Sequence, residues 1–242
     1  MQAVIHLHSD LSVLGQSILF QGLSEGELAR VARGVTRVQM PSRSILMSYA
    51  QASTMIYILV EGAVKVQVEQ PDGSLVVVAV LGPDQVLGEL SQADGLGCSA
   101  TVELLEASVV LRMPAGYYQH LLHTIPTLSA NVQRQLAQRL RLATQQIIAL
   151  TTFGAEGRVA AQIRALAQTY GQPNVTGLRQ IPFRLTQGTL AAMTGLSRVR
   201  VNQVLQRFQA EQIIALGPQF RLLVRDEVAL AAYAAAPRLP GA

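Results

Sequence analysis

The chain has little of what secreted and membrane proteins need. Its single cysteine in 242 residues, Cys98, can form no intrachain disulfide and cannot supply the roughly four thiolates of an iron–sulfur cluster. No segment approaches about 18 consecutive apolar residues, which argues against a membrane-spanning helix. The first ten residues lack the basic segment and apolar core of a secretory signal. These absences predict a protein of the reducing cytoplasm with no membrane partner.

The sequence also lacks the usual catalytic patterns. It contains no GxSxG motif, no Walker loop and no HExxH spacing, and no cluster of histidines, cysteines and carboxylates. We therefore expect neither an enzyme nor a bound metal.

Positive charge is concentrated in the C-terminal third. Residues 1–125 carry 6 basic and 11 acidic side chains, and residues 126–153 carry 3 basic and no acidic ones. Residues 154–242 carry 10 basic and 4 acidic side chains, a net charge of +6. A polyanion such as DNA would be attracted to that third and repelled by the N-terminal half.

The N-terminal half changes from helical to strand-like near residue 35. Ser24 followed by Glu27 is a capping-box pattern, so residues 1–30 are expected to be a helical lead-in. Farther on, short runs rich in Val, Ile and Leu are separated by glycine and proline, which favours an antiparallel barrel or sandwich. These runs are Ile56–Val60, Val64–Val68, Leu75–Leu81 and Ser108–Arg112.

One long helix is predicted from about Thr127 to Thr152, a stretch without glycine or proline. Apolar residues recur along it at alternating spacings of four and three, as in a coiled-coil seam. Such a seam favours pairing with a second copy of the chain about a two-fold axis, and packing against the protein's own barrel is the alternative. The expected dimer interface comprises Leu136, Leu140, Ala143, Ile147 and Leu150.

Leu185–Val224 has the pattern of a helix-turn-helix followed by a small hairpin. Thr186 is expected to cap the first helix and Ser197 the second, which runs from Arg198 to Gln209. Gly195 lies in the turn, where glycine is free to take a positive φ. The predicted buried face of the second helix comprises Val201, Val204, Leu205 and Phe208. Its outer face carries Arg, Asn and Gln, which read base edges in a major groove, so the sequence predicts specific DNA binding.

Four short motifs follow one another along the chain: Leu19–Ser24, Ile58–Val66, Val86–Leu90 and Gly195–Val201. In this order and spacing they resemble the opening helix, barrel hairpin, phosphate-binding cassette and recognition helix of the cyclic-AMP receptor protein/fumarate-nitrate regulator (CRP/FNR) family of bacterial transcription factors. The resemblance covers nearly the whole chain.

The resemblance implies an α+β fold in three parts. Residues 1–126 would be an antiparallel β-barrel of jelly-roll type, similar to cyclic-nucleotide-binding domains. Residues 127–153 would be a dimerisation helix, and residues 154–242 a winged helix-turn-helix domain. The implied function is a homodimeric transcription regulator on a near-palindromic double-stranded operator, with half-sites roughly 34 Å apart and RNA polymerase as a further partner.

The resemblance also implies which residues meet DNA. The residue matching Arg198 bonds a guanine in the family. Val199 stands where the cyclic-AMP receptor protein has a glutamate, and Gln203 where it has an arginine, so the half-site is expected to keep one guanine and to differ beside it. The expected base-reading residues are Arg198, Val199, Asn202 and Gln203. The expected phosphate contacts are Thr186, Gln187, Ser197 and Arg200.

The sequence departs from the family in the effector pocket. Members that bind cyclic AMP have an Arg-Ser pair after Gly-Glu, but here Cys98 replaces the arginine. Losing an arginine–phosphate contact costs on the order of 1.5–3 kcal/mol, about 10- to 100-fold in affinity. It would also leave Glu89 facing the anion without its counter-charge. Arg139 matches a family arginine near the ligand, and a solvated helix position is an equal alternative. The expected pocket comprises Gly88, Glu89, Cys98, Ser99, Arg139 and Thr144.

Several readings of the pocket stay open. The protein binds cyclic AMP weakly or not at all and acts without an effector, or it binds another small molecule, or it binds a cyclic nucleotide by another route. A haem or metal sensor would have to use the four histidines, and a redox sensor would use Cys98, although a lone thiol on an apolar loop is usually inert. The histidines are His6, His8, His120 and His123. A nucleotide-controlled module for an attached protein is a rival class, which the DNA-reading segment disfavours.

Overall fold

The computed structural model describes residues 14–15 and 17–235 of the chain. The chain divides into two compact units: Met1–Val68 with Leu81–Arg139, and Glu69–Val80 with Leu140–Ala242. The division falls within helix α5 (Pro126–Thr152), between Arg139 and Leu140.

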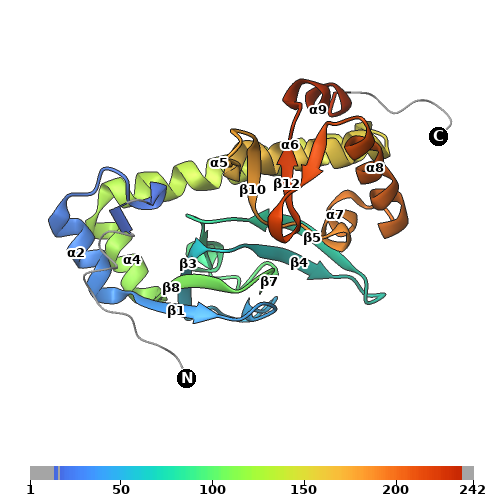
Figure 1. The fold of residues 1–242 in the computed structure, drawn as a ribbon. Coiled ribbons are helices and arrows are strands. Elements are labelled where there is room, and N and C mark those ends of the chain that lie inside the picture. The colour runs from blue at the N-terminus through green and yellow to red at the C-terminus, as the bar shows by residue number, and fades with distance from the viewer. Residues whose placement is uncertain (1–13, 16, 236–242) are drawn as a thin grey trace. The chain divides into compact units, whose positions relative to one another are not determined.

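Two four-stranded sheets form the strand-rich part of the chain (Figure 1). One has the strand order β1-β8-β3-β6 and the other β2-β7-β4-β5. The pairings of β1 and β3 with β8, of β3 with β6, and of β2 and β4 with β7 are antiparallel. This confirms the expected jelly-roll type of cyclic-nucleotide-binding fold. The strands are β1 (Thr36–Met40), β2 (Ile45–Met47), β3 (Met55–Glu61), β4 (Val64–Glu69), β5 (Leu75–Leu81), β6 (Val86–Leu87), β7 (Thr101–Leu104) and β8 (Ser108–Pro114).

Helices cover one part of the core of the first unit. They are η1 (Ile18–Phe20), α2 (Glu25–Gly34), α3 (Glu89–Asp94), α4 (Ala115–Thr124) and the first half of α5. The predicted capping box is present, since Glu27 N donates to Ser24 Oγ (3.4 Å) and Ser24 N donates to Glu27 Oε2 (2.7 Å). A buried cluster joins η1, α2, α4 and α5 to the first sheet. It includes Phe20, Val31, Ile56, Leu111, Met113, Leu121, Ile125 and Leu128.

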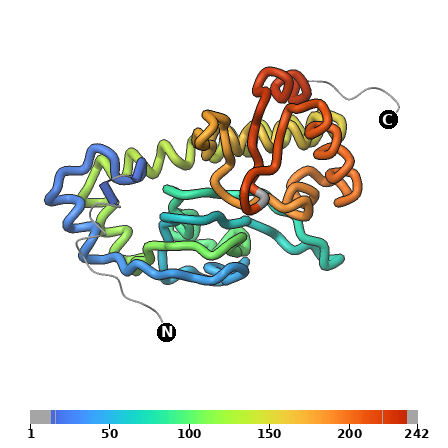
Figure 2. The backbone as a smooth tube through the Cα atoms, in the orientation of Figure 1, coloured from blue at the N-terminus to red at the C-terminus, as the bar shows by residue number. Residues whose placement is uncertain are grey.

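Helix α5 is a single unbroken α-helix of 27 residues, which Figure 2 shows running from green to yellow. Pro126 stands at its first position, where the fixed φ of proline suits a helix start and no backbone N–H is lost. The predicted helix is therefore confirmed to within one residue at its N-terminal end.

The second unit carries the helix-turn-helix. Thr189 N donates to Thr186 Oγ1 (3.0 Å) at the start of α7 (Gln187–Thr194). Arg200 N donates to Ser197 Oγ (3.2 Å) at the start of α8 (Arg198–Ala210), and Gly195 takes a φ of 65° in the turn between the helices. Both caps and the turn are as predicted.

The other elements of this unit support the two helices. Its sheet has the order β11-β12-β10-β9, and β11 and β12 form the predicted hairpin. Phe183 and Phe208 are fully buried in its core. The elements are α6 (Ala155–Tyr170), β9 (Gln172–Pro173), β10 (Arg179–Arg184), α7 (Gln187–Thr194), α8 (Arg198–Ala210), β11 (Ile214–Leu216), η2 (Pro218–Phe220), β12 (Arg221–Val224) and α9 (Glu227–Tyr233). Across the described part of the chain, no helix is both long and apolar enough to cross a bilayer.

Candidate nucleic-acid interface and effector pocket

Helix α8 separates a buried apolar face from an exposed polar one. Val201, Val204 and Phe208 are buried, as predicted. Leu205, predicted for the same face, is only half-buried and lines a surface hollow instead. Val199 is 68 % exposed, so its methyl groups are available to a thymine methyl in the major groove.

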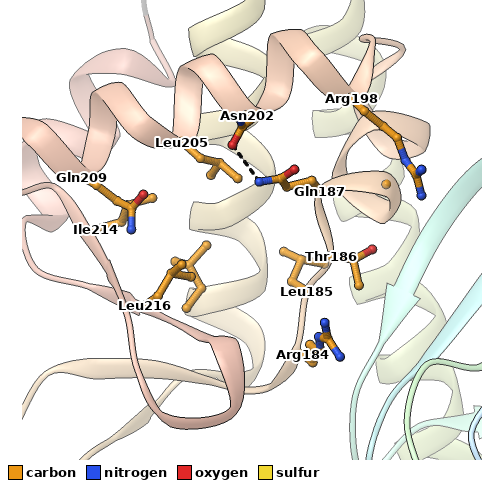
Figure 3. Close-up of a pocket in the computed structure, with 12 residues that line it drawn as sticks. Arg184, Leu185, Thr186, Gln187, Arg198, Asn202, Leu205, Gln209, Ile214 and Leu216 are labelled. Atoms are coloured by element: carbon orange, nitrogen blue, oxygen red, sulfur yellow. Dashed lines mark hydrogen bonds between the residues drawn. The ribbon is translucent and has the colours of Figure 1, made fainter.

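The hollow beside α8 has a volume of about 380 Å³ and is lined by both apolar and polar residues (Figure 3). It brings together four of the predicted DNA-contacting residues, namely Thr186, Gln187, Arg198 and Asn202. Figure 3 shows Arg184 and Arg198 on the side of the hollow away from the hairpin residue Leu216. The apolar lining comprises Leu185, Leu205, Ile214, Leu216 and Leu222.

The arginine at the start of α8 packs closely against Gly188 of α7, which has no side chain. A Cβ on Gly188 would lie 2.7 Å from Arg198 Nη2 and 2.9 Å from its Nε, so the absent side chain is what admits the guanidinium. One turn along α8, Asn202 Oδ1 accepts a hydrogen bond from Gln187 Nε2 at 2.7 Å (Figure 3). The predicted phosphate contact Gln187 and base reader Asn202 are thus joined to each other.

Arg200 has partners within the second unit. Its Nη2 lies 2.9 Å from Glu156 Oε1 on α6, and its Nη1 donates to Gln203 Oε1 at 3.3 Å. Arg207 Nη1 lies 3.9 Å from the same Glu156 oxygen. The predicted phosphate contact of Arg200 stays a prediction, and to make it the guanidinium must share or leave Glu156.

The two capping hydroxyls differ in whether they can make a further hydrogen bond to DNA. Ser197 Oγ accepts the Arg200 amide, which leaves its own hydrogen free to donate to a phosphate oxygen. Thr186 Oγ1 is engaged with both the Thr189 amide and the Thr189 hydroxyl, 2.9 Å away.

The predicted effector residues converge on a cavity of about 70 Å³ in the first unit. Gly88, Glu89, Cys98, Ser99 and Arg139 all line it. Thr144 belongs to the second unit, where its hydroxyl donates to Leu140 O at 2.9 Å. The remaining lining residues are largely apolar and include Met47, Val66, Leu81, Leu87 and Val102.

Arg139 supplies a counter-charge to Glu89. Its Nη1 lies 2.5 Å from Glu89 Oε1, and the Glu89 side chain is only 5 % exposed. The same guanidinium donates to Gln85 Oε1 at 3.0 Å and to the Val86 carbonyl oxygen. Gln135 supports this arrangement, since its Nε2 donates to Asp84 O at 2.6 Å and its Oε1 accepts from Val86 N at 3.0 Å. Arg139 is therefore held in place by the protein and is not a solvated helix residue.

Burial controls the ionisation of both reactive groups in this cavity. It raises the pKa of Glu89 above its ordinary 4.5, and the charge of Arg139 offsets part of that rise. Burial also raises the pKa of the Cys98 thiol, which therefore stays protonated at neutral pH. A protonated, buried thiol is a poor nucleophile and a poor redox sensor.

The sequence missed the residues that hold Arg139. Gln85 and Gln135 lie 54 and 4 positions away from it, and neither belongs to a recognisable motif. Their only signal is burial as polar residues, with 7 % and 9 % exposure, and that appears only in the folded chain.

The apolar seam of α5 is exposed over much of its length in the single chain. Leu140 and Ile147 are 69 % and 62 % exposed, and Ala143 is exposed as well. Leu150 is half-buried, and Leu136 packs against the core cluster of the first unit.

The histidines form no ligand cluster in the described residues. His6 and His8 lie outside them, and His123 Nδ1 lies 2.7 Å from Gln119 O, a neighbour on its own helix. His120 stacks near Tyr117 at 6.3 Å between ring centroids. From residue 17 to residue 235, no three His, Cys, Asp or Glu side chains are grouped as metal ligands would be.

Two family models match the chain in sequence order. The first is a cyclic nucleotide-binding domain over residues 37–124, and the second is a Crp-like helix-turn-helix domain over residues 157–233. The chain belongs to the CRP/FNR family of transcription regulators. Members of this family bind DNA as dimers, and duplex DNA is therefore a partner of this protein.

Curated CRP-family relatives match most of the chain. The CRP-like cAMP-activated global transcriptional regulator of Mycobacterium tuberculosis is 29 % identical over 197 residues, which cover 81 % of this chain and 87 % of that protein. The Cyclic AMP receptor protein of Thermus thermophilus is 28 % identical over 203 residues, 84 % of this chain and 90 % of that protein. The first of these relatives is a transcription regulator rather than an enzyme.

A solved structure confirms the CRP-family fold. FixK2 from Bradyrhizobium japonicum superposes with a TM-score of 0.72 at 18 % identity, covering 84 % of this chain and 98 % of that one. At this identity the likeness is one of fold alone.

Proposed function

We propose that this CRP/FNR-family protein binds a near-palindromic operator as a homodimer and needs no cyclic AMP to do so. One observation supports the effector-free part of the proposal: Arg139 and Glu89, which line the effector cavity, are bonded to each other. A group that a ligand must displace before it can bind lowers the affinity for that ligand.

The residues present do not fit a cyclic nucleotide. A cyclic phosphate calls for a cation, and the matching position holds the neutral thiol of Cys98. The carboxylate that takes the ribose hydroxyl in the family, here Glu89, is already bonded to Arg139. The cavity of about 70 Å³ is also well below the about 300–1,000 Å³ of typical small-molecule sites.

The exposed seam of α5 supports the homodimer. Leu140 and Ile147 are large apolar side chains that a second copy of the same helix would cover. Replacing Ile147 with Glu should convert the dimer to monomer in sedimentation velocity, because a two-fold interface places the charge there twice. Gln145→Glu adds the same charge at another exposed α5 position outside the predicted seam and should leave the dimer intact.

We further propose that the operator-bound dimer acts on RNA polymerase in the cytoplasm. The support is the family's role in transcription, and co-precipitation of polymerase with an operator–protein complex is the test. An operator complex that neither recruits polymerase nor competes with it would refute this part.

The central test is binding-site selection from a near-palindromic promoter library, with and without cyclic AMP. The expected result is an enriched operator whose affinity, in a gel shift at physiological salt, is the same in both conditions. Binding no tighter than to bulk DNA would refute the regulator, and sub-micromolar cyclic AMP binding in calorimetry would refute the effector-free part.

A further inference from the structure

Arg200 links the outer face of α8 to helix α6. Its guanidinium contacts Glu156 Oε1 through Nη2 (2.9 Å) and Gln203 Oε1 through Nη1 (3.3 Å). Glu156 stands in the first turn of α6, where the helix dipole favours a carboxylate, and its side chain is only 26 % exposed. The Arg200 guanidinium is thus anchored to Glu156 through one terminal nitrogen and contacts the predicted base reader Gln203 through the other.

This contact fixes the direction of the Gln203 amide. A guanidinium has only donors, so the amide atom facing Arg200 has to be the carbonyl oxygen. The amide cannot turn over without opposing two N–H groups. Because Gln203 is exposed, its NH₂ group is the end left for an outside partner.

The neighbouring reader has the same bias. Asn202 Oδ1 accepts from Gln187 Nε2 at 2.7 Å (Figure 3), so one of the two lone pairs of its carbonyl oxygen is used as well. Arg198 carries donors alone. The contacts within the protein thus leave more donor than acceptor capacity on α8 for a base edge.

Base edges in the major groove differ in what they offer to such donors. Guanine presents two acceptors, O6 and N7, whereas adenine presents the N7 acceptor beside the N6 amino donor. Glutamine reads adenine best when its oxygen accepts from N6 and its nitrogen donates to N7. At Gln203 the oxygen is engaged by a cation, which also repels the partial positive charge of the N6 amino group.

We propose that Arg200 is a specificity-determining residue that sets Gln203 to read guanine instead of adenine. This inference rests on the proposed operator binding. It predicts a half-site with two guanine contacts, one from Arg198 and one from Gln203, although Arg200 itself touches neither base.

The test is binding-site selection with the full-length protein and four variants. Gln203→Ala identifies the base pair that Gln203 reads, because preference relaxes there alone. The wild type should prefer guanine over adenine at that base pair by at least about 5-fold, the lower end of a good bidentate contact. Arg200→Ala should abolish that preference or turn it to adenine. Glu156→Gln, which releases Arg200 from its anchor, should weaken it.

Arg207→Ala is the matched control. It removes the same charge from the same helix, and its contacts are with Glu211 (2.8 Å), Glu156 (3.9 Å) and the Tyr233 ring, not with a predicted base reader. It should keep guanine at the Gln203 base pair, and every variant should keep guanine at the Arg198 base pair.

Two results would overturn the inference while leaving operator binding intact: adenine at the Gln203 base pair in the wild type, or unchanged guanine preference in Arg200→Ala. If Arg200→Ala does not fold, Glu156→Gln decides alone, and an unchanged preference there counts against the inference. Enrichment of no sequence by the wild type would refute operator binding itself, which separates the two failures.

Discussion

Two pockets described above use arginine in opposite ways. In the first unit, Arg139 bonds to Glu89 in the lining of a cavity of about 70 Å³. In the second unit, Arg198 lies over Gly188 at the rim of a hollow of about 380 Å³, exposed to solvent. Arg139 donates its hydrogen bonds within the protein, whereas the exposed guanidinium of Arg198 can donate to a partner.

The difference implies that a partner gains more free energy by binding at Arg198 than by entering the pocket of Arg139. A ligand entering the first pocket must break charge-assisted hydrogen bonds before it makes its own, and it gains only the difference. A guanine approaching Arg198 displaces mainly water. The second unit thus offers polar groups at an open surface, whereas in the first unit the charged groups that line the cavity are bonded to each other.

Removing the charge of Arg139 should have the largest effect, a loss of folding stability. Arg139→Ala leaves a carboxylate that is 5 % exposed without its counter-charge, which we expect to lower the free energy of unfolding by about 3 kcal/mol. The measurement is urea unfolding followed by circular dichroism. Arg139→Ala combined with Glu89→Gln should recover most of the loss. No loss in the single variant would show that the pocket is not held closed by this pair.

The same pair predicts a pH dependence. Because burial holds the pKa of Glu89 above its ordinary 4.5, the folded state binds this proton more tightly than the unfolded state. The free energy of unfolding contributed by this group is therefore highest below about pH 4.5 and falls as the pH rises through the raised pKa. Glu89→Gln should remove this slope, and Arg139→Ala should extend it to higher pH and so enlarge the total loss of stability, since the arginine charge lowers the pKa of Glu89. An identical slope in all three proteins would contradict the assignment.

Placing the family's arginine at position 98 should partly restore cyclic AMP binding. Cys98→Arg places a guanidinium where the cyclic phosphate would lie, and a charged hydrogen bond of about 1.5–3 kcal/mol should raise cyclic AMP affinity about 10- to 100-fold. Calorimetry measures the gain, and Cys98→Ser controls for the loss of the thiol. An equal gain in the serine variant would mean that charge is not what the pocket lacks.

On the open side, Arg198→Ala should cost about 1–3 kcal/mol of operator binding and relax preference at one base pair. The readout is the affinity for the selected operator compared with single-base variants of it. An equal loss on every sequence, with a shallower salt dependence, would make Arg198 a phosphate contact.

The sequence predicted the second unit better than the pocket of the first. Caps and turns are local, so Thr186, Gly195 and Ser197 could be placed from their own neighbours. The bonds of Arg139 could not, because the resemblance assigned Glu89 to the same pocket, but the contact between these two residues, 50 positions apart, forms only when the chain folds. Leu205 was wrongly placed with the buried face, since helical periodicity does not show that its end of the face opens into a hollow.

The smallest effect separates the two roles of Ser197. As a helix cap it accepts the Arg200 amide, and Ser197→Ala should cost about 1 kcal/mol in unfolding free energy. Ser197→Asp keeps a capping oxygen and adds favourable charge at the helix start, so stability should be retained. The added carboxylate would, however, repel a phosphate and lower affinity about equally for all DNA sequences. Urea unfolding and gel shifts on specific and random DNA measure the two effects. If the aspartate variant binds DNA as well as the wild type, Ser197 is a cap alone, and the phosphate contact predicted for the start of α8 is wrong.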